Sequence, residues 1–550
     1  MRNVVRLWFQ EKIHKLSILW IHRTAMDHAL LINRFAAEQG QPGWSRQRLL
    51  HEALRHAIRS GSLPPGRRLL ASRALAAELG WARNTVIYAY EQLASEGWIS
   101  AGRRGTVVSA RPSSLVPAAG GARALDQDRG LELQAPAQAP LSRRTAGLAC
   151  LPVAADLAAA FAPGVPALDA FPLELWRRLM MRAWRALSAA QLNYGPPAGE
   201  PALREAIAAH LRASRAVRCS AEQVFISDGT QASLDLCARA FADAGDKVWI
   251  ESPGYGGALT AFRAAQLRPI GIAVDAQGMA PRPQDWLQHR PKLIYVTPSH
   301  QYPSGAVMSL ERRLALIAQA RQHGSLIIED DYDSEFRYDG PPLAALQGLG
   351  ADIDTLDAAQ PASDAPVLYL GTFSKTLFPG LRIGFMVVPP ERVQALQHLL
   401  ARSAPRGRAA EQLALAEFMR EGHFGLHLRR MRRLYQQRRD ALVAALEQQL
   451  GDSAQVRGAS AGMHLALCFE PELGLDDLAL SAAALHAGIV APALSQHRVG
   501  RRANTWSGLM LGYAQVPAEQ MSERVGRLAA LIRARLGGTE GESQGMKKKA

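Results

Sequence analysis

The 550-residue sequence has few cysteines. It holds four, none of them in a C-x-x-C pair, which argues against a disulfide framework and against a cysteine-based zinc site: Cys150, Cys219, Cys237 and Cys468. We predict no metal site. Isolated thiols of this kind are typical of a reducing compartment, so we expect a cytoplasmic protein.

Long hydrophobic runs are also missing. Charged residues interrupt every apolar stretch well before the ~20 residues that a membrane-spanning helix needs. We therefore expect no transmembrane helix and no membrane partner. A chain of 550 residues with 48% hydrophobic and 21% charged residues is instead expected to form at least two globular units.

Acidic residues are under-represented, with 49 Asp and Glu against 64 Lys and Arg and a formal net charge of +15. The imbalance is concentrated between Trp44 and Arg111, where 11 arginines face 4 glutamates. A basic excess confined to one short segment indicates a nucleic-acid partner, whereas basic residues spread evenly usually form a solvated surface.

Hydrophobic periodicity disappears between residues 111 and 150, where Ala, Pro and Gly dominate. A stretch of this length is uncommon inside one compact domain, so we interpret it as a linker. It separates a small domain, residues 44–110, from a large domain, residues 151–538.

The two ends of the chain have weaker patterns. Residues 1–43 are interpreted as an N-terminal extension, and Met26 offers a second candidate start. We hypothesise that part of this extension is absent from the natural protein. Residues 539–550 are rich in Gly, Glu and Lys and are predicted to be a disordered tail.

The small domain shows the order of elements of a winged helix-turn-helix. An apolar helical face predicts a first helix that ends in the turn at 61–66. A second helix is expected from Ser72, as N-cap, to Gly80, as C-cap, and a third from Arg83 to Gly97. The domain is therefore predicted to be mostly α, with a small β wing after the third helix.

Two short strands, 98–100 and 106–109, are expected to form that wing. In such a unit the N-terminal end of the third helix enters the DNA major groove, and the wing lies near phosphates. We therefore predict a double-stranded DNA operator as partner. Six side chains of the second helix, third helix and wing are expected to contact it: Arg73, Arg83, Asn84, Thr85, Arg103 and Arg104.

Residues 45–110 resemble the DNA-binding domain of the GntR superfamily, through the segment from Leu63 to Val86. The chain has Leu70-Ala71 where that family usually has Pro-Ser or Pro-Thr. We expect this difference to alter the start of the second helix locally without removing DNA binding.

Short apolar runs recur in the large domain, and each is followed by polar residues: 247–250, 293–296, 326–328 and 367–370. Runs without alternation suit strands of a parallel sheet that is buried on both faces, so the expected class is α/β. Ligands of open α/β sheets gather at the carboxyl ends of the strands. The pattern therefore predicts one shared pocket at that edge.

The run 369–384 carries Lys375 in a turn rich in Thr, Ser and Gly, followed by Arg382. This arrangement is what a pyridoxal 5′-phosphate (PLP) site needs, because the lysine amine can form a Schiff base with the PLP aldehyde. Thr372, Ser374 and Arg382 are expected to bind the phosphate.

Further residues complete this predicted PLP site. Tyr255 is expected to stack on the ring, Asp330 to pair with the pyridinium nitrogen, and Tyr332 to hydrogen-bond the phenolate oxygen of the ring. A helix N-terminus can hold phosphate, and three residues are expected there: Gly229, Thr230 and Gln231.

Other interpretations of single residues are weaker. Ser299 and His300 could be a nucleophile and a base, but no orienting acid stands at a recognisable spacing. Asp330 and Asp331 could form a solvated turn, and a tyrosine in a Pro-Gly turn usually serves packing. The ordered set of residues, more than any single member, indicates PLP.

Residues 165–536 are similar to fold-type I aminotransferases, through motifs at 193–204, 297–305, 329–338 and 369–384. With the N-terminal domain, the whole chain resembles the MocR-type regulators. That family implies PLP as cofactor and a head-to-tail homodimer, in which each DNA-binding unit lies over the partner's large domain. Tyr194 matches a position that reaches the phosphate site of the neighbouring subunit.

Two departures from the aminotransferases bear on function. Gly257 and Met510 stand where relatives place arginines that bind a substrate carboxylate, and weak anchoring of that group removes much of the substrate's orientation. We therefore favour a transcriptional regulator that senses PLP, or an amine or amino-acid ligand, through a Schiff base at Lys375. Its expected targets are genes of vitamin B6 or amino-acid metabolism.

Two alternatives stay open. One is a working PLP-dependent aminotransferase that carries a DNA-binding domain, because Asp330, Tyr332, Lys375 and Arg382 are retained. The other is a constitutive DNA-binding protein whose large domain only dimerises.

Overall fold

The computed structural model describes residues 28–41, 43–102, 105–109, 159–353, 365–403, 407–500 and 506–547, with the backbone alone for 351–353, 471 and 537–547. The expected linker, Arg103 and Arg104 lie outside the described residues. The chain divides into two compact units, Met1–Ala135 and Pro136–Ala550. In the parts described, no helix has the length and apolar character needed to cross a bilayer.

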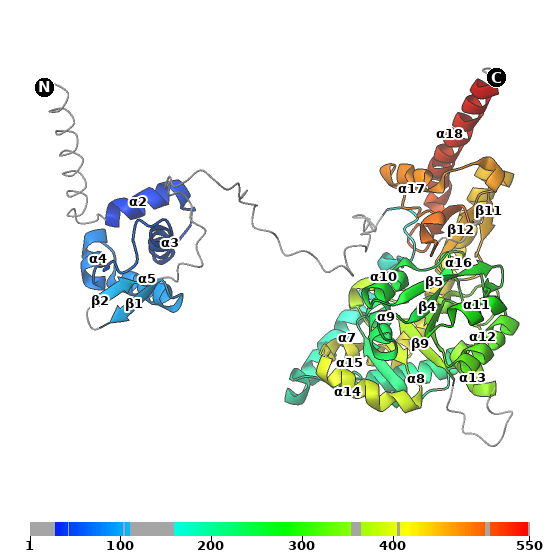
Figure 1. The fold of residues 1–550 in the computed structure, drawn as a ribbon, viewed down its shortest axis with the longest axis horizontal. Coiled ribbons are helices and arrows are strands. Elements are labelled where there is room, and N and C mark those ends of the chain that lie inside the picture. The colour runs from blue at the N-terminus through cyan, green and yellow to red at the C-terminus, as the bar shows by residue number, and fades with distance from the viewer. Residues whose placement is uncertain are drawn as a thin grey trace, which may run out of the picture. The chain divides into compact units, whose positions relative to one another are not determined.

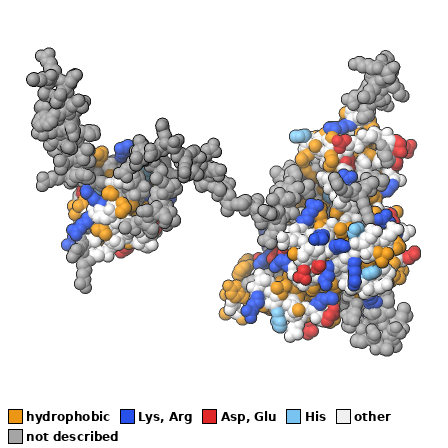
Figure 2. Space-filling model, in the orientation of Figure 1, with side chains coloured by type: hydrophobic (Ala, Val, Ile, Leu, Met, Phe, Trp, Pro, Cys, Tyr) orange, Lys and Arg blue, Asp and Glu red, His pale blue; other side chains and the backbone are white. Residues whose placement is uncertain are grey.

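The first unit is the winged helix-turn-helix that the sequence predicts (Figure 1). Its wing is the antiparallel pair β1 and β2, with Ile99 opposite Val108. On the face seen in Figure 2, blue Lys and Arg side chains are more prominent than red acidic ones. The elements are α2 His28–Gln39, α3 Arg46–Arg59, α4 Ser72–Leu79, α5 Arg83–Ser95, β1 Ile99–Gly102 and β2 Gly105–Val108.

Helix α2 lies within the expected N-terminal extension but belongs to the core of this unit. Ile32 and Phe35 are buried in the cluster formed by α3, α4 and α5. The backbone N–H of His28 donates to Glu78 Oε1 at 2.8 Å. The packed unit therefore includes α2, which lies before the boundary expected at residue 44, because apolar residues at helical spacing precede that boundary.

The start of α4 differs from the expectation. Ala71 occupies the N-cap position and makes no side-chain cap, so Ser72 is the first helical residue and not the cap. The alanine side chain has no oxygen with which to accept a backbone N–H, although the Ala71 backbone oxygen accepts from the Leu75 N–H at 3.0 Å. Gly80 ends the helix in the left-handed conformation, at φ 64°, as the sequence predicts.

The large unit is built on an eight-stranded sheet with the order β3-β10-β9-β8-β7-β4-β5-β6. Strands β5, β4, β7, β8 and β9 are parallel, whereas β10 runs antiparallel to both of its neighbours, β3 and β9. The strands are β3 Val224–Ser227, β4 Lys247–Ser252, β5 Arg268–Asp275, β6 Gly278–Met279, β7 Leu293–Val296, β8 Leu326–Asp331, β9 Val367–Thr372 and β10 Gly384–Val387.

Both faces of this sheet are covered, which explains the unbroken apolar runs. On β4, Val248 and Ile250 belong to one hydrophobic cluster and Trp249 to another. Helices lie on either side, as Figure 1 shows. They include α7 Leu173–Ala186, α8 Pro201–Arg215, α9 Thr230–Phe241, α10 Gly256–Ala264, α11 Pro283–His289, α12 Leu310–His323, α13 Leu346–Ile353, α14 Val393–Ser403 and α15 Ala409–Arg420.

A smaller antiparallel sheet, in the order β11-β12-β13, follows the long helix α16. The last helix of the large unit, α18, extends to Lys547, whereas the sequence predicts a disordered tail from residue 539. Once a packed helix has formed, each added residue extends it by one hydrogen bond, so a weak sequence can continue it. The elements are α16 His423–Leu450, β11 Gln455–Arg457, β12 His464–Cys468, α17 Asp477–His486, β13 Gly508–Gly512 and α18 Met521–Lys547.

Candidate functional site

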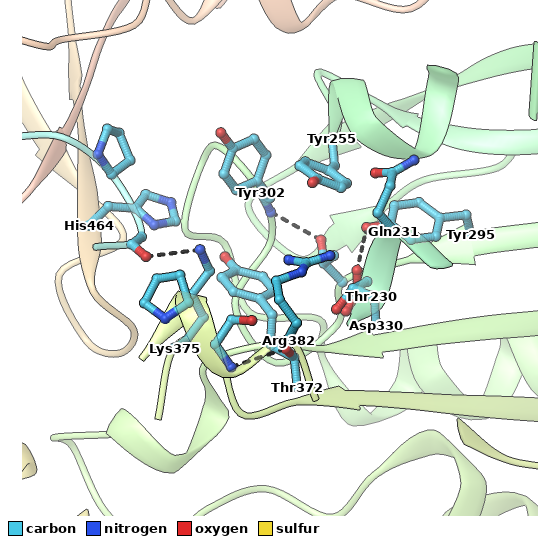
Figure 3. A pocket seen from close by; sticks show the side chains of 16 residues that line it. Thr230, Gln231, Tyr255, Tyr295, Tyr302, Asp330, Thr372, Lys375, Arg382 and His464 are labelled. Atoms are coloured by element: carbon cyan, nitrogen blue, oxygen red, sulfur yellow. Dashed lines mark hydrogen bonds between the residues drawn. The ribbon is translucent and has the colours of Figure 1, made fainter. Parts of the chain in front are cut away.

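A cavity of about 330 Å³ lies at the carboxyl ends of β7, β8 and β9, where the sequence predicts a pocket (Figure 3). Nine of the residues expected in the PLP site line it together: Thr230, Gln231, Tyr255, Asp330, Tyr332, Thr372, Ser374, Lys375 and Arg382. Seven further lining residues were not predicted: Pro163, Gly164, Tyr295, Thr297, Tyr302, Pro379 and His464.

Asp330 is a buried carboxylate with one oxygen unused. Its Oδ2 accepts a hydrogen bond from the Tyr295 hydroxyl at 2.8 Å, while Oδ1 has no partner among the described residues. Burial raises the pKa of Asp330 to about 7, against the opposing effects of the Tyr295 hydrogen bond and of Lys375. An orphaned, desolvated carboxylate oxygen in a cavity suits a cationic N–H, such as that of a pyridinium ring.

Its neighbour Asp331 has a different environment, because successive residues of a strand point to opposite faces. Asp331 Oδ2 accepts hydrogen bonds from Arg215 Nε at 2.8 Å and from the Tyr369 hydroxyl at 2.6 Å. All three side chains are buried. The pair Asp330-Asp331 is therefore not a solvated turn: Asp331 is part of a structural ion pair and Asp330 faces the cavity.

Lys375 follows β9 and extends its amine into the cavity. Nζ donates to the backbone oxygen of Gly164 at 2.8 Å. Burial lowers the pKa of Lys375, and Arg382 acts in the same direction, while Asp333 and Asp330 oppose it. A lowered pKa increases the neutral fraction of the amine, which is the nucleophilic form.

The opposite end of the cavity is suited to a phosphate group. Gly229 is the N-cap of α9 at φ 96°, and an added Cβ there would lie 3.3 Å from Arg382 Nη2. The glycine thus brings the first backbone N–H groups of α9 close to a guanidinium, with the Thr230 hydroxyl beside them. Arg382 Nη2 also donates to the Asp228 backbone oxygen at 2.7 Å. Together with Asp330 and Lys375, these residues fit PLP.

Tyr332 lines the cavity, but its hydroxyl is already engaged. It donates to the backbone oxygen of His300 at 2.9 Å and lies 3.2 Å from His300 Nδ1. A phenolate oxygen of the cofactor ring needs a donor, and a tyrosine has a single hydroxyl proton. The expected contact of Tyr332 with that oxygen therefore requires this hydroxyl to change partners.

The remaining predicted residues lie in different places. Tyr255 packs edge-on against Tyr302, with ring centroids 5.4 Å apart. Tyr194 is 82% exposed and does not line the cavity, so its role in a partner's site stays a prediction. Met510 is buried in a small cluster that includes Tyr302, and Gly257 lies in α10.

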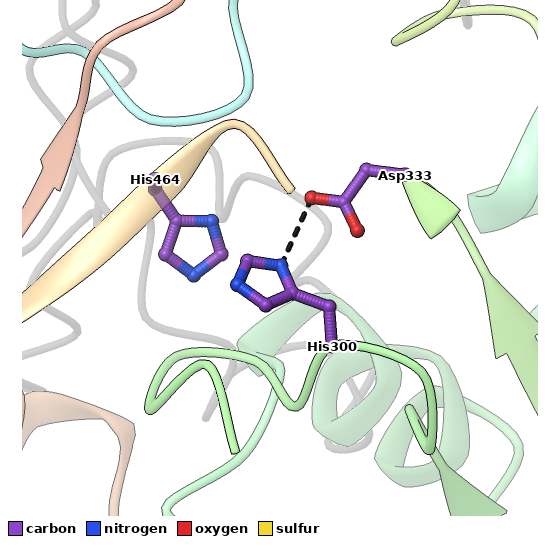
Figure 4. Close-up of side chains that lie close together, drawn as sticks. All are labelled: His300, Asp333 and His464. Carbon is purple, nitrogen blue, oxygen red and sulfur yellow. Dashed lines mark hydrogen bonds and ion pairs between the residues drawn. The ribbon is translucent and has the colours of Figure 1, made fainter. Parts of the chain in front are cut away.

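His300, Asp333 and His464 form a buried group beside the cavity (Figure 4). The sequence suggested no acid for His300, yet Asp333 Oδ2 lies 3.0 Å from His300 Nδ1. Ser299 does not complete a nucleophile pair, because its Oγ accepts from Arg215 Nη2 at 2.8 Å. The three residues offer ligand atoms within 4.8 Å of one another, and a hydrogen bond already joins the side chains of His300 and Asp333.

The expected DNA-contacting residues lie at the N-terminus of α5 and on α4. Arg73, Arg83 and Asn84 are exposed, and Thr85 is half-buried. Tyr88, one turn after Asn84, is 49% exposed and was not predicted. Three polar side chains at a free helix end match a recognition helix that enters the major groove.

Comparison with known proteins assigns a family to each unit. Residues 47–108 match the family described as "Bacterial regulatory proteins, gntR family", and residues 164–528 match "Aminotransferase class I and II". The first match covers α3 to the wing, and the second covers the cavity and both sheets of the large unit.

Two relatives match this chain over most of their length. The chain is 38% identical to a probable rhizopine catabolism regulatory protein, MocR, of Rhizobium meliloti, over 88% of this chain and 92% of that protein. It is 32% identical to the pyridoxine biosynthesis transcriptional regulator PdxR of Corynebacterium glutamicum, over 84% and 91%.

Among solved structures, the α-aminoadipate aminotransferase LysN of Thermus thermophilus, crystallised with N-(5′-phosphopyridoxyl)-L-leucine, is similar with a TM-score of 0.60 and 29% identity. The match covers 69% of this chain and 92% of LysN. The chain therefore belongs to the MocR-type regulators, in which a gntR-family DNA-binding domain precedes an aminotransferase class I and II domain.

Proposed function

We propose that this DNA-binding transcriptional regulator holds PLP in the cavity of its large unit and that occupation of the cavity changes its affinity for operator DNA. One observation carries the proposal: the unpartnered Asp330 Oδ1 and the amine of Lys375 belong to the same cavity. A domain that served dimerisation alone would have no need of such a pair.

Several cavity residues have a specific task toward PLP. When bound, PLP supplies an aldehyde that condenses with a primary amine and a ring that withdraws electrons. Asp330 accepts the ring N–H through Oδ1, and Lys375 presents its amine from the end of β9. Tyr255 covers the ring, while Arg382 and the N-terminus of α9 hold the phosphate.

The same lining favours a sensor over a transaminase. Arg382 is the one guanidinium among the described residues that line the cavity, and it stands at the phosphate end. A substrate α-carboxylate therefore lacks a bidentate partner there. The retained Asp330 and Lys375 favour the second candidate, an aminotransferase, which predicts that some amino acid converts the bound cofactor to its amine form. A broad amino-acid panel without spectral conversion would remove that candidate.

We further propose the homodimer that the family implies. Large apolar side chains are exposed between residues 168 and 194, and surfaces of this kind mark contacts with other chains: Leu168, Leu173, Met181, Trp184, Leu192 and Tyr194. Two DNA-binding units in one dimer would read two half-sites, so a change in their separation would change operator affinity.

The proposed function is tested by fluorescence anisotropy on DNA from immediately upstream of this gene and its neighbours, at one salt concentration. PLP-free protein, PLP-loaded protein and a Lys375→Ala variant are compared. Lys292→Ala, at an exposed position, serves as the control for loss of a lysine charge. Specific binding that shifts with PLP in wild type and in Lys292→Ala, but not in Lys375→Ala, is the expected result. Specific binding that ignores PLP would contradict the proposal.

A further inference from the structure

Arg382 has a backbone conformation that is unfavourable for an arginine. Its φ is 51° and its ψ is 41°, in the left-handed region that favours glycine. A residue other than glycine stays in this region only where its surroundings fix it, and such residues are frequent at ligand-binding sites. In the proposed function, Arg382 holds the phosphate of PLP. A residue that fixes the backbone of Arg382 therefore affects how that phosphate is bound.

Arg408 makes contacts that fix this backbone. Its Nη1 donates to the Arg382 backbone oxygen at 3.1 Å, and its Nη2 donates to the backbone oxygen of Leu381. These two oxygens belong to the planar peptide groups on either side of the Arg382 Cα. Since φ and ψ describe the rotation of those two groups about the Cα, a guanidinium that binds both carbonyls fixes both angles.

The same guanidinium also contacts the residue that holds the side chain of Arg382. Arg408 Nη1 donates to Asp228 Oδ1 at 3.3 Å, and the Asp228 backbone oxygen accepts Arg382 Nη2 at 2.7 Å. Asp228 immediately precedes Gly229, the N-cap of α9. Arg408 therefore connects the backbone of Arg382, the acceptor of its guanidinium and the start of α9, which together make up the proposed phosphate site.

Arg408 itself is positioned by α15, which it precedes as the N-cap residue. Ala410, in the first turn of this helix, is buried. Gln412 Nε2 donates to the Gly407 backbone oxygen at 2.9 Å, and Gln412 Oε1 accepts the backbone N–H of Glu200 at 2.9 Å. The start of α15 is thus attached to the rest of the large unit, and Arg408 reaches Arg382 from a fixed base.

Arg408 is absent from the described lining of the cavity, so it acts on a ligand only through other residues. Building on the proposed function, we infer that Arg408 is a positioning residue that holds Arg382 in the conformation that binds the phosphate. It thereby determines how strongly the cavity prefers PLP to pyridoxal, the same aldehyde without a phosphate. A ligand without a phosphate gains nothing from Arg382 and is indifferent to Arg408.

Three ligands test this inference on full-length wild type and on Arg408→Ala. PLP and pyridoxal are titrated by visible absorption. Inorganic phosphate, which reports on the phosphate site alone, is titrated by its competition with PLP. One hydrogen bond to a charged group changes affinity by roughly tenfold, so the dissociation constants of PLP and inorganic phosphate should both rise about tenfold. The dissociation constant of pyridoxal should stay near its wild-type value.

Two further variants separate positioning from charge. Arg408→Lys keeps the positive charge but lacks the planar fork that binds two carbonyls, so it should lose most of the preference for PLP. Arg239→Ala removes an arginine of α9 that pairs with Asp235 at the surface, and it should leave all three dissociation constants unchanged. The Arg408 side chain is 38% exposed, so its replacement leaves no cavity in the core. Circular dichroism establishes that each variant is folded.

Different failures have different meanings. A folded Arg408→Ala variant with wild-type affinity for inorganic phosphate, or one in which PLP and pyridoxal weaken equally, would overturn the inference and leave PLP binding intact. An Arg408→Lys variant that binds as wild type does would also overturn it, because charge alone would then explain the effect of Arg408. Wild-type protein that takes up no PLP would overturn the proposed function, and this inference with it.

Discussion

In the DNA-binding unit the side chains expected to touch a ligand are exposed at one helix end, whereas in the large unit they line a buried cavity. Arg83 and Asn84 are exposed on α5, but Asp330 depends on Tyr295 and on three charged neighbours. An exposed contact can change without loss of the fold. A buried contact also contributes to stability. Substitutions in the DNA-binding unit should therefore reduce DNA binding alone, whereas substitutions at the cavity should also change the free energy of unfolding.

The largest effect is expected at Asp331, on the structural side of β8. Asp331→Ala leaves the buried guanidinium of Arg215 without its carboxylate partner and should lower the free energy of unfolding by about 3–5 kcal/mol. Chemical denaturation of PLP-free protein measures the loss. Asp275→Ala, which removes a half-exposed partner of Arg312, should cost below about 1 kcal/mol. Equal losses of stability in the two variants would contradict the structural role of the buried Asp331–Arg215 ion pair.

Asp330→Asn should instead weaken the binding of PLP. The amide keeps the shape of the carboxylate but not its charge, and a hydrogen bond to a charged group contributes about 1.5–3 kcal/mol, which corresponds to roughly a 10- to 150-fold rise in the dissociation constant for PLP. Fluorescence titration with PLP measures it. DNA binding by the PLP-free variant should match that of PLP-free wild type. A PLP affinity within twofold of wild type would count against the role of Oδ1.

The raised pKa of Asp330 predicts a pH dependence of stability without PLP. In the unfolded chain an aspartate loses its proton near pH 4, whereas burial raises the pKa to about 7 in the folded protein. Between these values the folded state binds the extra proton, so stability falls as the pH rises from about 4 to 7 and then levels off. The fall attributable to Asp330 should be about 1–3 kcal/mol between pH 5 and 7. Thermal melts across this range should show a smaller slope in Asp330→Asn than in wild type, and equal slopes would contradict the assignment.

Arg83→Ala should affect DNA and nothing else. Loss of one arginine contact to a base or phosphate costs about 1–3 kcal/mol of binding free energy. Anisotropy at fixed salt measures it, with Arg59→Ala as the control for an exposed arginine outside the predicted contacts. The cofactor spectrum and the thermal midpoint should stay at their wild-type values. A shift in either would show that Arg83 does more than contact DNA.

The smallest effect is expected at Tyr194. If its hydroxyl reaches the phosphate of the partner subunit, Tyr194→Phe should reduce the binding free energy of PLP by about 0.5–1.5 kcal/mol. The proposed homodimer should still be observed by analytical ultracentrifugation. Tyr88→Phe, another exposed tyrosine, is the matched control. No change in PLP affinity would leave Tyr194 without a role at the phosphate.

Local patterns in the sequence were sufficient where the structure depends on neighbours along the chain. The helix and strand order of the winged unit and the strand β7 follow from periodicity and capping, and the Lys375 turn follows from its residue types. Helix α2 was missed although Ile32 and Phe35 have helical spacing. There the signal was present but lay in a segment set aside as an extension.

Partners brought together by tertiary structure could not be predicted in the same way. Tyr295 reaches Asp330 because β7 and β8 are adjacent and parallel, and His464 comes from a different sheet, far along the chain. Asp333 supplies the acid that the sequence did not suggest for His300. In each case the spacing along the chain carries no information, since the contact depends on how the strands are ordered.

The cavity is lined by residues of two sheets, and a single carboxylate joins them. Asp333 stands just past the end of β8, three positions after Asp330, and its Oδ2 accepts the N–H of Met463 at the start of β12. A displacement of the start of β12 and a cofactor ring held by Asp330 would therefore act on the same short segment, 330–333. Communication between the two sheets inside the large unit would then need to cross only one strand end.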